Sequence, residues 1–77
     1  MKLVILYTKV NCPLCEDAKQ LLEFLQLDHP FELKEVDIYQ NDDLLEKYQL
    51  MIPVVEIDGV EVDYGQVSID HISKHLV

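Results

Sequence analysis

The sequence predicts an α/β fold, formed by one domain over residues 1–77, with a mixed four-stranded sheet and helices on both of its faces. Three observations support this class. Strand-like and helix-like apolar segments alternate along the chain, an Asp58-Gly59 pair separates two short apolar runs, and no linker or repeat interrupts the sequence. The predicted order is strand, helix, strand, helix, strand, strand, helix, and a right-handed crossover should make the first two strands parallel.

The first strand is expected from Leu3 to Tyr7, a continuous apolar run typical of a strand that is covered on both faces. A helix should follow, because apolar residues recur at intervals of three and four. These residues are Ala18, Leu21, Leu22 and Leu25. Pro13 suits the first position of this helix and Pro30 prevents its continuation, so the N-cap is expected at Asn11 or Cys12.

The second strand is expected from Phe31 to Ile38. Its apolar parity shifts between Leu33 and Val36, which predicts a β-bulge or a strand whose paired part begins late. After it, the run of Asn41, Asp42 and Asp43 is typical of a helix N-terminus, because such side chains cap free backbone N–H groups. The helix that they start should contain Leu44, Leu45 and Tyr48.

The clearest local pattern is PVVEIDGVEVDY, in which Asp58-Gly59 supplies the positive φ angles of a tight hairpin turn. Two antiparallel strands should flank this turn. The last predicted element is an amphipathic helix with Ile69, Ile72 and Leu76 on its apolar side and Ser68 near its N-cap.

Composition narrows the classes of partner. The chain has six basic and fifteen acidic residues, a net charge of -9, and this field should repel nucleic acid and anionic membranes. The apolar run between Lys2 and Lys9 is too short for a signal peptide, and no other stretch is long enough to span a membrane. We therefore expect a monomeric cytoplasmic protein, whose thiols stay reduced.

Cys12 and Cys15 are the only cysteines, and their spacing leaves three interpretations. A structural zinc site needs four ligands, yet the only histidines are His29, His71 and His75, and the last two should lie on the wet flank of the final helix. A disulfide that closes so short a loop stabilises a fold by only about 2 kcal/mol. We therefore expect no metal and favour the third interpretation, a redox couple.

The redox interpretation assigns a different role to each cysteine. Cys12, at or near the N-cap, faces free backbone N–H groups and the positive end of the helix dipole, which lower the pKa of a thiol. Cys15 lies three residues before Ala18, on the apolar side of the helix. Cys12 is thus the expected nucleophile and Cys15 the resolving thiol. Lys9 favours the thiolate of Cys12, whereas Glu16 and Asp17 oppose it.

The run from Tyr7 to Cys15, YTKVNCPLC, together with Met51-Ile52-Pro53, resembles the glutaredoxins. CPLCEDA is most similar to a group of short bacterial glutaredoxin-like proteins, and the resemblance extends over nearly the whole chain. It implies a minimal thioredoxin fold with strand order 2-1-3-4, a cis Ile52-Pro53 bond, and pairing of the residue before that proline with the substrate backbone. The expected substrate-binding residues are Lys9, Pro13, Leu14, Ile52, Pro53, Tyr64 and Gly65.

Two departures from the glutaredoxin pattern concern glutathione. Leu14 stands where dithiol glutaredoxins usually carry an aromatic residue between the cysteines. After the hairpin, the family usually has Gly-Gly followed by an acid, whereas this chain has Asp63-Tyr-Gly-Gln-Val67, which keeps only Gly65 and adds a negative charge. These differences and the acidic net charge predict weak binding of anionic glutathione.

The sequence therefore predicts a thiol–disulfide oxidoreductase that acts in electron transport and cell redox homeostasis. Its expected partners are a protein that carries a disulfide and a cytosolic dithiol reductant, with no bound cofactor. Two alternatives remain open. One is glutaredoxin activity with glutathione as co-substrate, and the other is an interaction module of the thioredoxin fold whose cysteines do not turn over.

Overall fold

The computed structural model describes residues 1–77 and contains one four-stranded sheet, three α-helices and a short 3-10 helix. The elements are β1 (Lys2–Thr8), α1 (Pro13–Gln26), β2 (Phe31–Asp37), η1 (Ile38–Gln40), α2 (Asp42–Tyr48), β3 (Val54–Ile57), β4 (Val60–Tyr64) and α3 (Ile69–Lys74). The strand order is β2-β1-β3-β4, with β1 parallel to β2 and antiparallel pairing elsewhere. The predicted fold class and strand order are therefore confirmed.

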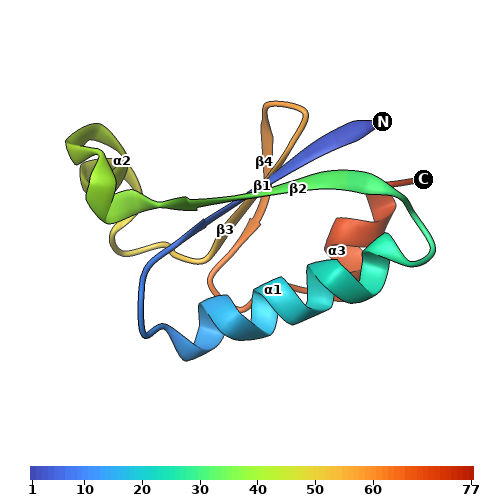
Figure 1. The fold of residues 1–77 in the computed structure, drawn as a ribbon, viewed down its shortest axis with the longest axis horizontal. Helices are drawn as coiled ribbons and strands as arrows, with labels where there is room; N and C mark the ends of the chain where they lie inside the picture. The colour runs from blue at the N-terminus through green and yellow to red at the C-terminus, as the bar shows by residue number, and fades with distance from the viewer.

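The helices lie on both faces of the sheet but cover them unequally. In Figure 1, α1 runs beneath the sheet and α3 lies near its right-hand end, and Ile72 of α3 shares a core with Ala18 and Leu22 of α1. Helix α2 lies at the other end of the molecule from the two chain termini. The larger core fills the space between α1, α3 and the sheet. It consists of Val4, Leu6, Ala18, Leu22, Leu25, Phe31, Val55, Ile57 and Ile72.

A smaller core lies on the other face, where Ile38, Tyr48 and Val54 are buried together. Because α2 has only seven residues, it covers one end of this face. The expectation that both faces of β1 are covered is therefore only half right. Val4 and Leu6 are fully buried beneath α1, whereas Leu3, on the opposite face, remains 36% exposed.

The bulge that the parity shift in β2 suggested is absent. All seven residues of β2 pair in unbroken register with β1, and the register shift in the sheet falls instead between Val55 and Glu56. The parity shift has another cause. Leu33 pairs with Val4 and packs on the larger core, whereas Val36 pairs with Tyr7 on the face that α2 covers. β2 therefore places the apolar side chain of Leu33 on the face that α1 covers and that of Val36 on the face that α2 covers.

Local chemistry sets the ends of the elements. Asn41 caps α2, because its Oδ1 accepts hydrogen bonds from the N–H groups of Asp43 and Leu44. Asp58 and Gly59 have φ angles of 48° and 87°, as the predicted hairpin turn requires.

The last helix departs from its predicted pattern at two positions. α3 ends at Lys74, and Leu76 lies beyond it, packed against the larger core. Ile72 is fully buried, but Ile69 at the first position of α3 is 40% exposed. Ser68 occupies the N-cap without a side-chain hydrogen bond. None of the helices has the length and apolar composition needed to cross a membrane.

Candidate active site

Four segments meet at one end of the sheet, next to the cysteines. The register pairs Thr8 with Asp37 at the ends of β1 and β2, Tyr7 with Val54 at the start of β3, and Val54 with Tyr64 at the end of β4. Three loops therefore leave or enter the sheet at the same end. They are residues 9–12, residues 38–41 with η1, and residues 51–53. The turn that begins at Gly65, after β4, lies at the same end.

The loop after β1 turns sharply before it delivers Cys12. Asn11 has a φ of 59°, a left-handed conformation that asparagine tolerates better than most residues. Cys12 follows in extended conformation as the N-cap of α1, and its Sγ accepts a hydrogen bond from the backbone N–H of Cys15 at 3.2 Å. The sulfur thus takes the place that an oxygen usually occupies at an N-cap, among free N–H groups that favour negative charge.

Cys15 lies behind Cys12 on the apolar side of α1. It is 3% exposed and belongs to the same buried stripe as Ala18 and Leu22, whereas Cys12 is half-buried. The two residues form a disulfide, with a Cα–Cα distance of 5.2 Å. The predicted difference in burial is confirmed, so an outside molecule reaches the sulfur of Cys12 before that of Cys15.

The segment Met51-Ile52-Pro53 forms a second side of the site, and the Ile52-Pro53 bond is cis, as the family resemblance implies. The register places Pro53 beside the end of β1, because the next residue, Val54, pairs with Tyr7. Ile52 donates its N–H to the carbonyl of Tyr48 at 3.2 Å, while its own carbonyl accepts no hydrogen bond from the chain. Only the carbonyl of Ile52 is therefore free to pair with another backbone.

Gly65 ties this segment to the end of β4. Its N–H lies 3.0 Å from the carbonyl oxygen of Met51 and 2.8 Å from that of Pro53. Gly65 has a φ of 69°, a conformation that glycine adopts without strain. Tyr64, just before it, is exposed. The structure thus brings four of the predicted substrate-binding residues, Ile52, Pro53, Tyr64 and Gly65, to one place.

The sequence predicts that Asp63 adds negative charge where an anion would dock. Its carboxylate instead accepts hydrogen bonds from backbone N–H groups of the segment that follows it. Oδ1 accepts from the N–H of Tyr64 at 2.9 Å and Oδ2 from the N–H of Ser68 at 2.7 Å, and the ring of His71 lies 3.5 Å from Oδ2. The side chain of Asp63 is only 14% exposed, so it joins β4 to α3 more than it contributes to the surface.

Leu14 and Pro13 stand at the surface on the first turn of α1. Leu14 is 46% exposed and lines a small cavity of about 140 Å³ between α1 and the loop after Gly65, whose Gln66 and Val67 form the opposite wall. Leucine, in the position where glutaredoxins usually carry an aromatic residue, therefore contributes an apolar edge to the site.

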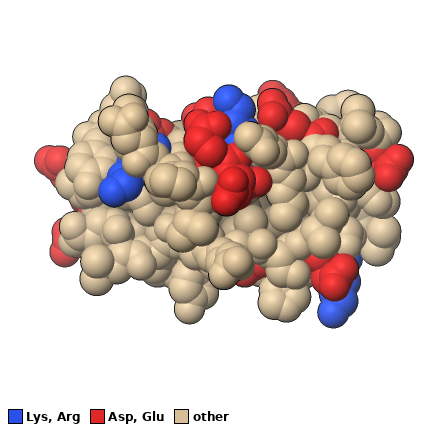
Figure 2. Space-filling view, turned by 90° about the horizontal axis from the view of Figure 1, so that it is seen from below, with Lys and Arg blue, Asp and Glu red and all other residues tan.

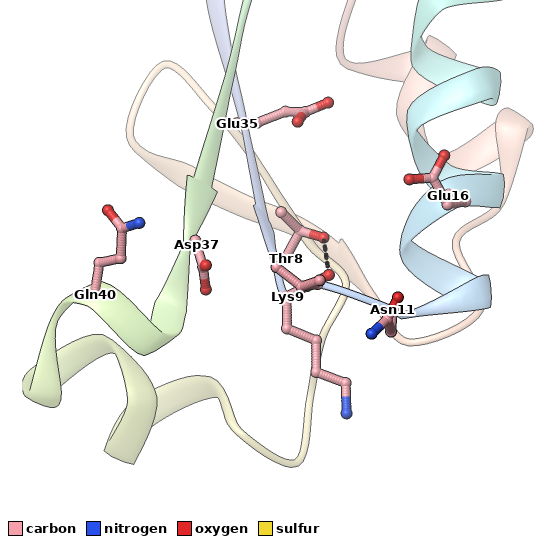
Figure 3. A pocket seen from close by; sticks show the side chains of 8 residues that line it. Thr8, Lys9, Asn11, Glu16, Glu35, Asp37 and Gln40 are labelled. Atoms are coloured by element: carbon pink, nitrogen blue, oxygen red, sulfur yellow. Dashed lines mark hydrogen bonds between the residues drawn. The ribbon is translucent and has the colours of Figure 1, made fainter.

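Lys9 lines two depressions on the other side of the cysteine loop, which also share Val10 and Asp37. One, of about 280 Å³, is formed by Lys9, Val10, Asp37 and Tyr39, and the other, of about 550 Å³, extends past Glu16 and Glu35 to Gln40. In Figure 3, Glu16 and Glu35 point toward the space between α1 and β2, while the Lys9 side chain runs away from both of them. Lys9 takes part in no ion pair.

Several residues of these depressions were not predicted from the sequence. Tyr39 looks like a packing residue in the sequence, yet it is 60% exposed beside Lys9. Asp37, at the end of β2, accepts a hydrogen bond from the N–H of Tyr39 and so fixes the start of η1. One sequence pattern could have indicated this turn, namely an aspartate placed two residues before a backbone amide that its side chain can cap.

A polar network supports the Met51–Pro53 segment from the far face of the sheet. Tyr48 is 1% exposed, stacks on Tyr7 and donates its hydroxyl to Glu61, while Tyr7 donates to Glu56 at 3.4 Å. Burial and the hydrogen bond to Glu61 raise the pKa of Tyr48 far above its usual value of 10.0. Burial and the negative charge of Glu56 raise the pKa of Tyr7.

The structure contains no group of three or more histidine, cysteine or carboxylate side chains suited to hold a metal ion. His71 on α3 and His75 at its C-cap are both exposed, as the sequence predicts.

Comparison with known proteins agrees with this geometry. A family model described as a glutaredoxin-like domain (DUF836) matches residues 3–77. The solution structure of protein Ne2328 from Nitrosomonas europaea is 27% identical, with 99% of this chain and 92% of that chain covered and a TM-score of 0.89.

Two thioredoxins share the fold at lower identity. A thioredoxin variant from Halobacterium salinarum is 18% identical over 97% of this chain and 71% of its own, with a TM-score of 0.71. Oxidised mitochondrial thioredoxin 3 from Saccharomyces cerevisiae is 18% identical over 97% of this chain and 76% of its own, with a TM-score of 0.69. The match to the family model over nearly the whole sequence, on a fold shared with thioredoxins, shows that this chain belongs to the glutaredoxin-like domain family (DUF836).

Proposed function

We propose that this protein is a thiol–disulfide oxidoreductase that reduces disulfides in protein partners through Cys12 and Cys15. The observation that carries the proposal is the unequal placement of the two sulfurs. Cys12 is half-buried at the N-cap of α1, where its Sγ accepts the N–H of Cys15, and Cys15 is buried behind it. Such a pair supplies an accessible nucleophile and a protected resolving thiol.

The reaction proceeds by two thiol–disulfide exchanges. The Cys12 thiolate attacks one sulfur of the partner disulfide, so a Cys12–partner bond forms, the partner disulfide breaks, and the departing sulfur takes up a proton. Cys15 then loses its proton and attacks Cys12 Sγ, which forms the Cys12–Cys15 disulfide and releases the second partner thiol. Two electrons pass to the partner, and an external dithiol returns them by the reverse exchanges.

The remaining site residues suit a protein segment as substrate. The free carbonyl of Ile52 can accept one hydrogen bond from an extended backbone. The exposed side chains of Leu14, on the first turn of α1, and Tyr64, just before Gly65, offer apolar contact. Tyrosine is a frequent anchor at protein interfaces. These features support a polypeptide substrate over a small molecule.

Glutathione-coupled activity is the second candidate, and Lys9 is the feature that favours it. Its ammonium group has no carboxylate partner in the chain and could meet a carboxylate of glutathione. Glu16, Glu35 and Asp37 line the same depression and oppose an anion there. We therefore rank glutathione below a protein disulfide as substrate.

The test follows reduction of a disulfide-linked protein by the dithiol form of this chain under single-turnover conditions. The wild type should reduce it, Cys12→Ser should not, and Cys15→Ser should accumulate a covalent mixed disulfide, visible as a mass increase equal to the partner. A parallel assay with a mixed disulfide of glutathione and a small thiol compares the two substrate classes. The wild-type protein could instead fail to cycle between dithiol and disulfide and show the same lack of reduction as Cys12→Ser. That result would identify an interaction module.

A further inference from the structure

Four exposed apolar or aromatic side chains lie on the elements that meet at the cysteine end of the sheet. We call Val10, Leu14, Tyr39 and Tyr64 the docking surface. They are between 46% and 72% exposed. Val10 lies in the loop after β1, Leu14 in the first turn of α1, Tyr39 in η1 and Tyr64 at the end of β4. Residues of this size gain free energy when a partner removes them from water. The docking surface therefore fits a polypeptide whose side chains are partly apolar.

One side of the docking surface is acidic. The depression of about 550 Å³ is lined by the carboxylates of Glu16, Glu35 and Asp37, against the single ammonium group of Lys9. Only Glu35 has a cationic partner, Lys19, at 3.2 Å, and both of these side chains remain exposed. Figure 3 shows Asp37 directed into the space beside Lys9, and the Lys9 ammonium group turned outward.

The charge of the whole molecule acts in the same direction. The net charge is -9, and on the face seen in Figure 2 acidic groups gather in clusters while broad uncharged areas lie between them. Such a field attracts a cationic segment and slows the approach of an anionic one. Charge complementarity thus favours a positively charged segment as the partner of the docking surface.

We infer that the partner presents a lysine or arginine close to its reacting half-cystine, in an extended segment that lies on the docking surface. This inference rests on the proposed disulfide reduction and adds the partner's chemistry to it. The aliphatic stem of the basic residue packs on Val10 and Tyr39, and its charged end meets Asp37 and Glu16 in the depression. Arginine suits the place best, because its planar group also stacks on an exposed aromatic ring.

The test uses three peptides, each with one intramolecular disulfide and identical except for the residues that flank it, which are arginine, alanine or glutamate. The reduced protein is mixed with each peptide, and the second-order rate constant of reduction is measured by mass spectrometry. Each value is divided by the rate constant with dithiothreitol, a neutral dithiol, because flanking charges also change the reactivity of the disulfide itself.

The arginine peptide should be reduced about tenfold faster than the glutamate peptide, with alanine between them, and 0.5 M NaCl should bring the ratio close to one. Asp37→Asn should lower the arginine-to-glutamate ratio by about threefold, because it removes the charge but keeps the Oδ1 that accepts from Tyr39. Glu32→Gln is the matched control, since Glu32 is an exposed acid on the same strand outside the depression.

The outcomes separate the two proposals. Equal normalised rate constants for the three peptides, or equal effects of Asp37→Asn and Glu32→Gln, would overturn the preference for a basic partner and leave disulfide reduction standing. Failure to reduce any of the peptides, while dithiothreitol reduces all of them, would overturn the proposed function and this inference with it.

Discussion

Cys12 and Cys15 occupy one turn of one helix, yet their surroundings differ in two respects. Cys12 caps the helix and is half-buried, whereas Cys15 belongs to the buried side of α1 with Ala18 and Leu22, at 3% exposure. Residues three apart lie on the same side of a helix, about one turn from each other along its axis. Cys12 therefore lies at the end of the helix, and Cys15, one turn further along, lies against the core. Helix geometry therefore already sets which of the two cysteines is the more exposed.

Tyr48 is the buried residue whose environment gives the clearest pH dependence. Its pKa is raised by burial and by Glu61, so the folded state keeps the phenol protonated at a pH where the unfolded chain ionises it. The stability that this supplies is fully present below pH 10.0, the unfolded value, and is lost as pH rises from there through the folded pKa.

We predict that Tyr48→Phe lowers the free energy of unfolding by about 1 to 2 kcal/mol at pH 8, because a hydrogen bond to a charged group is lost. Above pH 10 this difference should shrink by about 1.4 kcal/mol per pH unit. Urea unfolding at several pH values measures it. Tyr39→Phe, at an exposed ring, serves as control, and a difference that stays constant to pH 11.5 would contradict the argument.

At the scale of elements, the two glycines offer a matched pair. Both have positive φ angles, and an added Cβ would meet no atom within 4 Å at either one. Gly59 turns the β3–β4 hairpin, whereas Gly65 donates its N–H to Met51 and Pro53 beside the cysteines. An alanine at either position therefore introduces backbone strain alone, at a different distance from the site.

We predict that Gly59→Ala and Gly65→Ala each lower the free energy of unfolding by about 1 kcal/mol, the usual cost of a left-handed conformation for alanine. Only Gly65→Ala should also slow reduction of a peptide disulfide, by about threefold or more, because it disturbs the Met51–Pro53 segment. Rate constants are compared with the alkylation rate of Cys12, which should not change. Equal slowing by both variants would point to a general loss of stability.

Elements fixed by local chemistry could be predicted from the sequence. Asn41 caps α2 and Asp58-Gly59 turns the hairpin because their side chains and φ preferences act on adjacent backbone. The positions of Cys12 and Cys15 followed from helical periodicity in the same way. The cis Ile52-Pro53 bond followed from the family resemblance, since a proline in a sequence does not reveal its isomer.

Features that depend on distant neighbours could not be predicted. The parity shift in β2 reflects which helix covers each face, and that is settled only when α2 is placed. Tyr39 is exposed because the chain turns away through η1 after Asp37, and the depression beside it needs β2 and α1 together. Asp63 faces inward because the amide of Ser68 returns to it from the following loop.

At the scale of the whole molecule, the net charge of -9 places like charges close together over a small surface. The ion pairs Lys19–Glu35 and Lys47–Glu61 are exposed and contribute little to stability. Mutual repulsion of the remaining acids should therefore be the larger electrostatic effect, and dissolved salt screens it.

We predict that raising NaCl from 10 mM to 0.5 M increases the free energy of unfolding by about 1 kcal/mol, as measured by urea titration. The triple variant Glu23→Gln, Asp28→Asn, Glu32→Gln removes three exposed acids outside the ion pairs and should respond less to salt. Salt that destabilises the wild type would show that the ion pairs outweigh the repulsion.

The stacked rings of Tyr7 and Tyr48 have a practical consequence for anyone who studies this chain in solution. Their centroids lie 4.7 Å apart, and the sequence contains four tyrosines and no tryptophan. Tyrosine therefore dominates the intrinsic fluorescence, and part of it comes from a pair that joins β1 to α2 on the face opposite α1. The molecule carries its own optical reporter of α2 detachment, which requires no engineered fluorophore and lies across the sheet from α1 and its thiols.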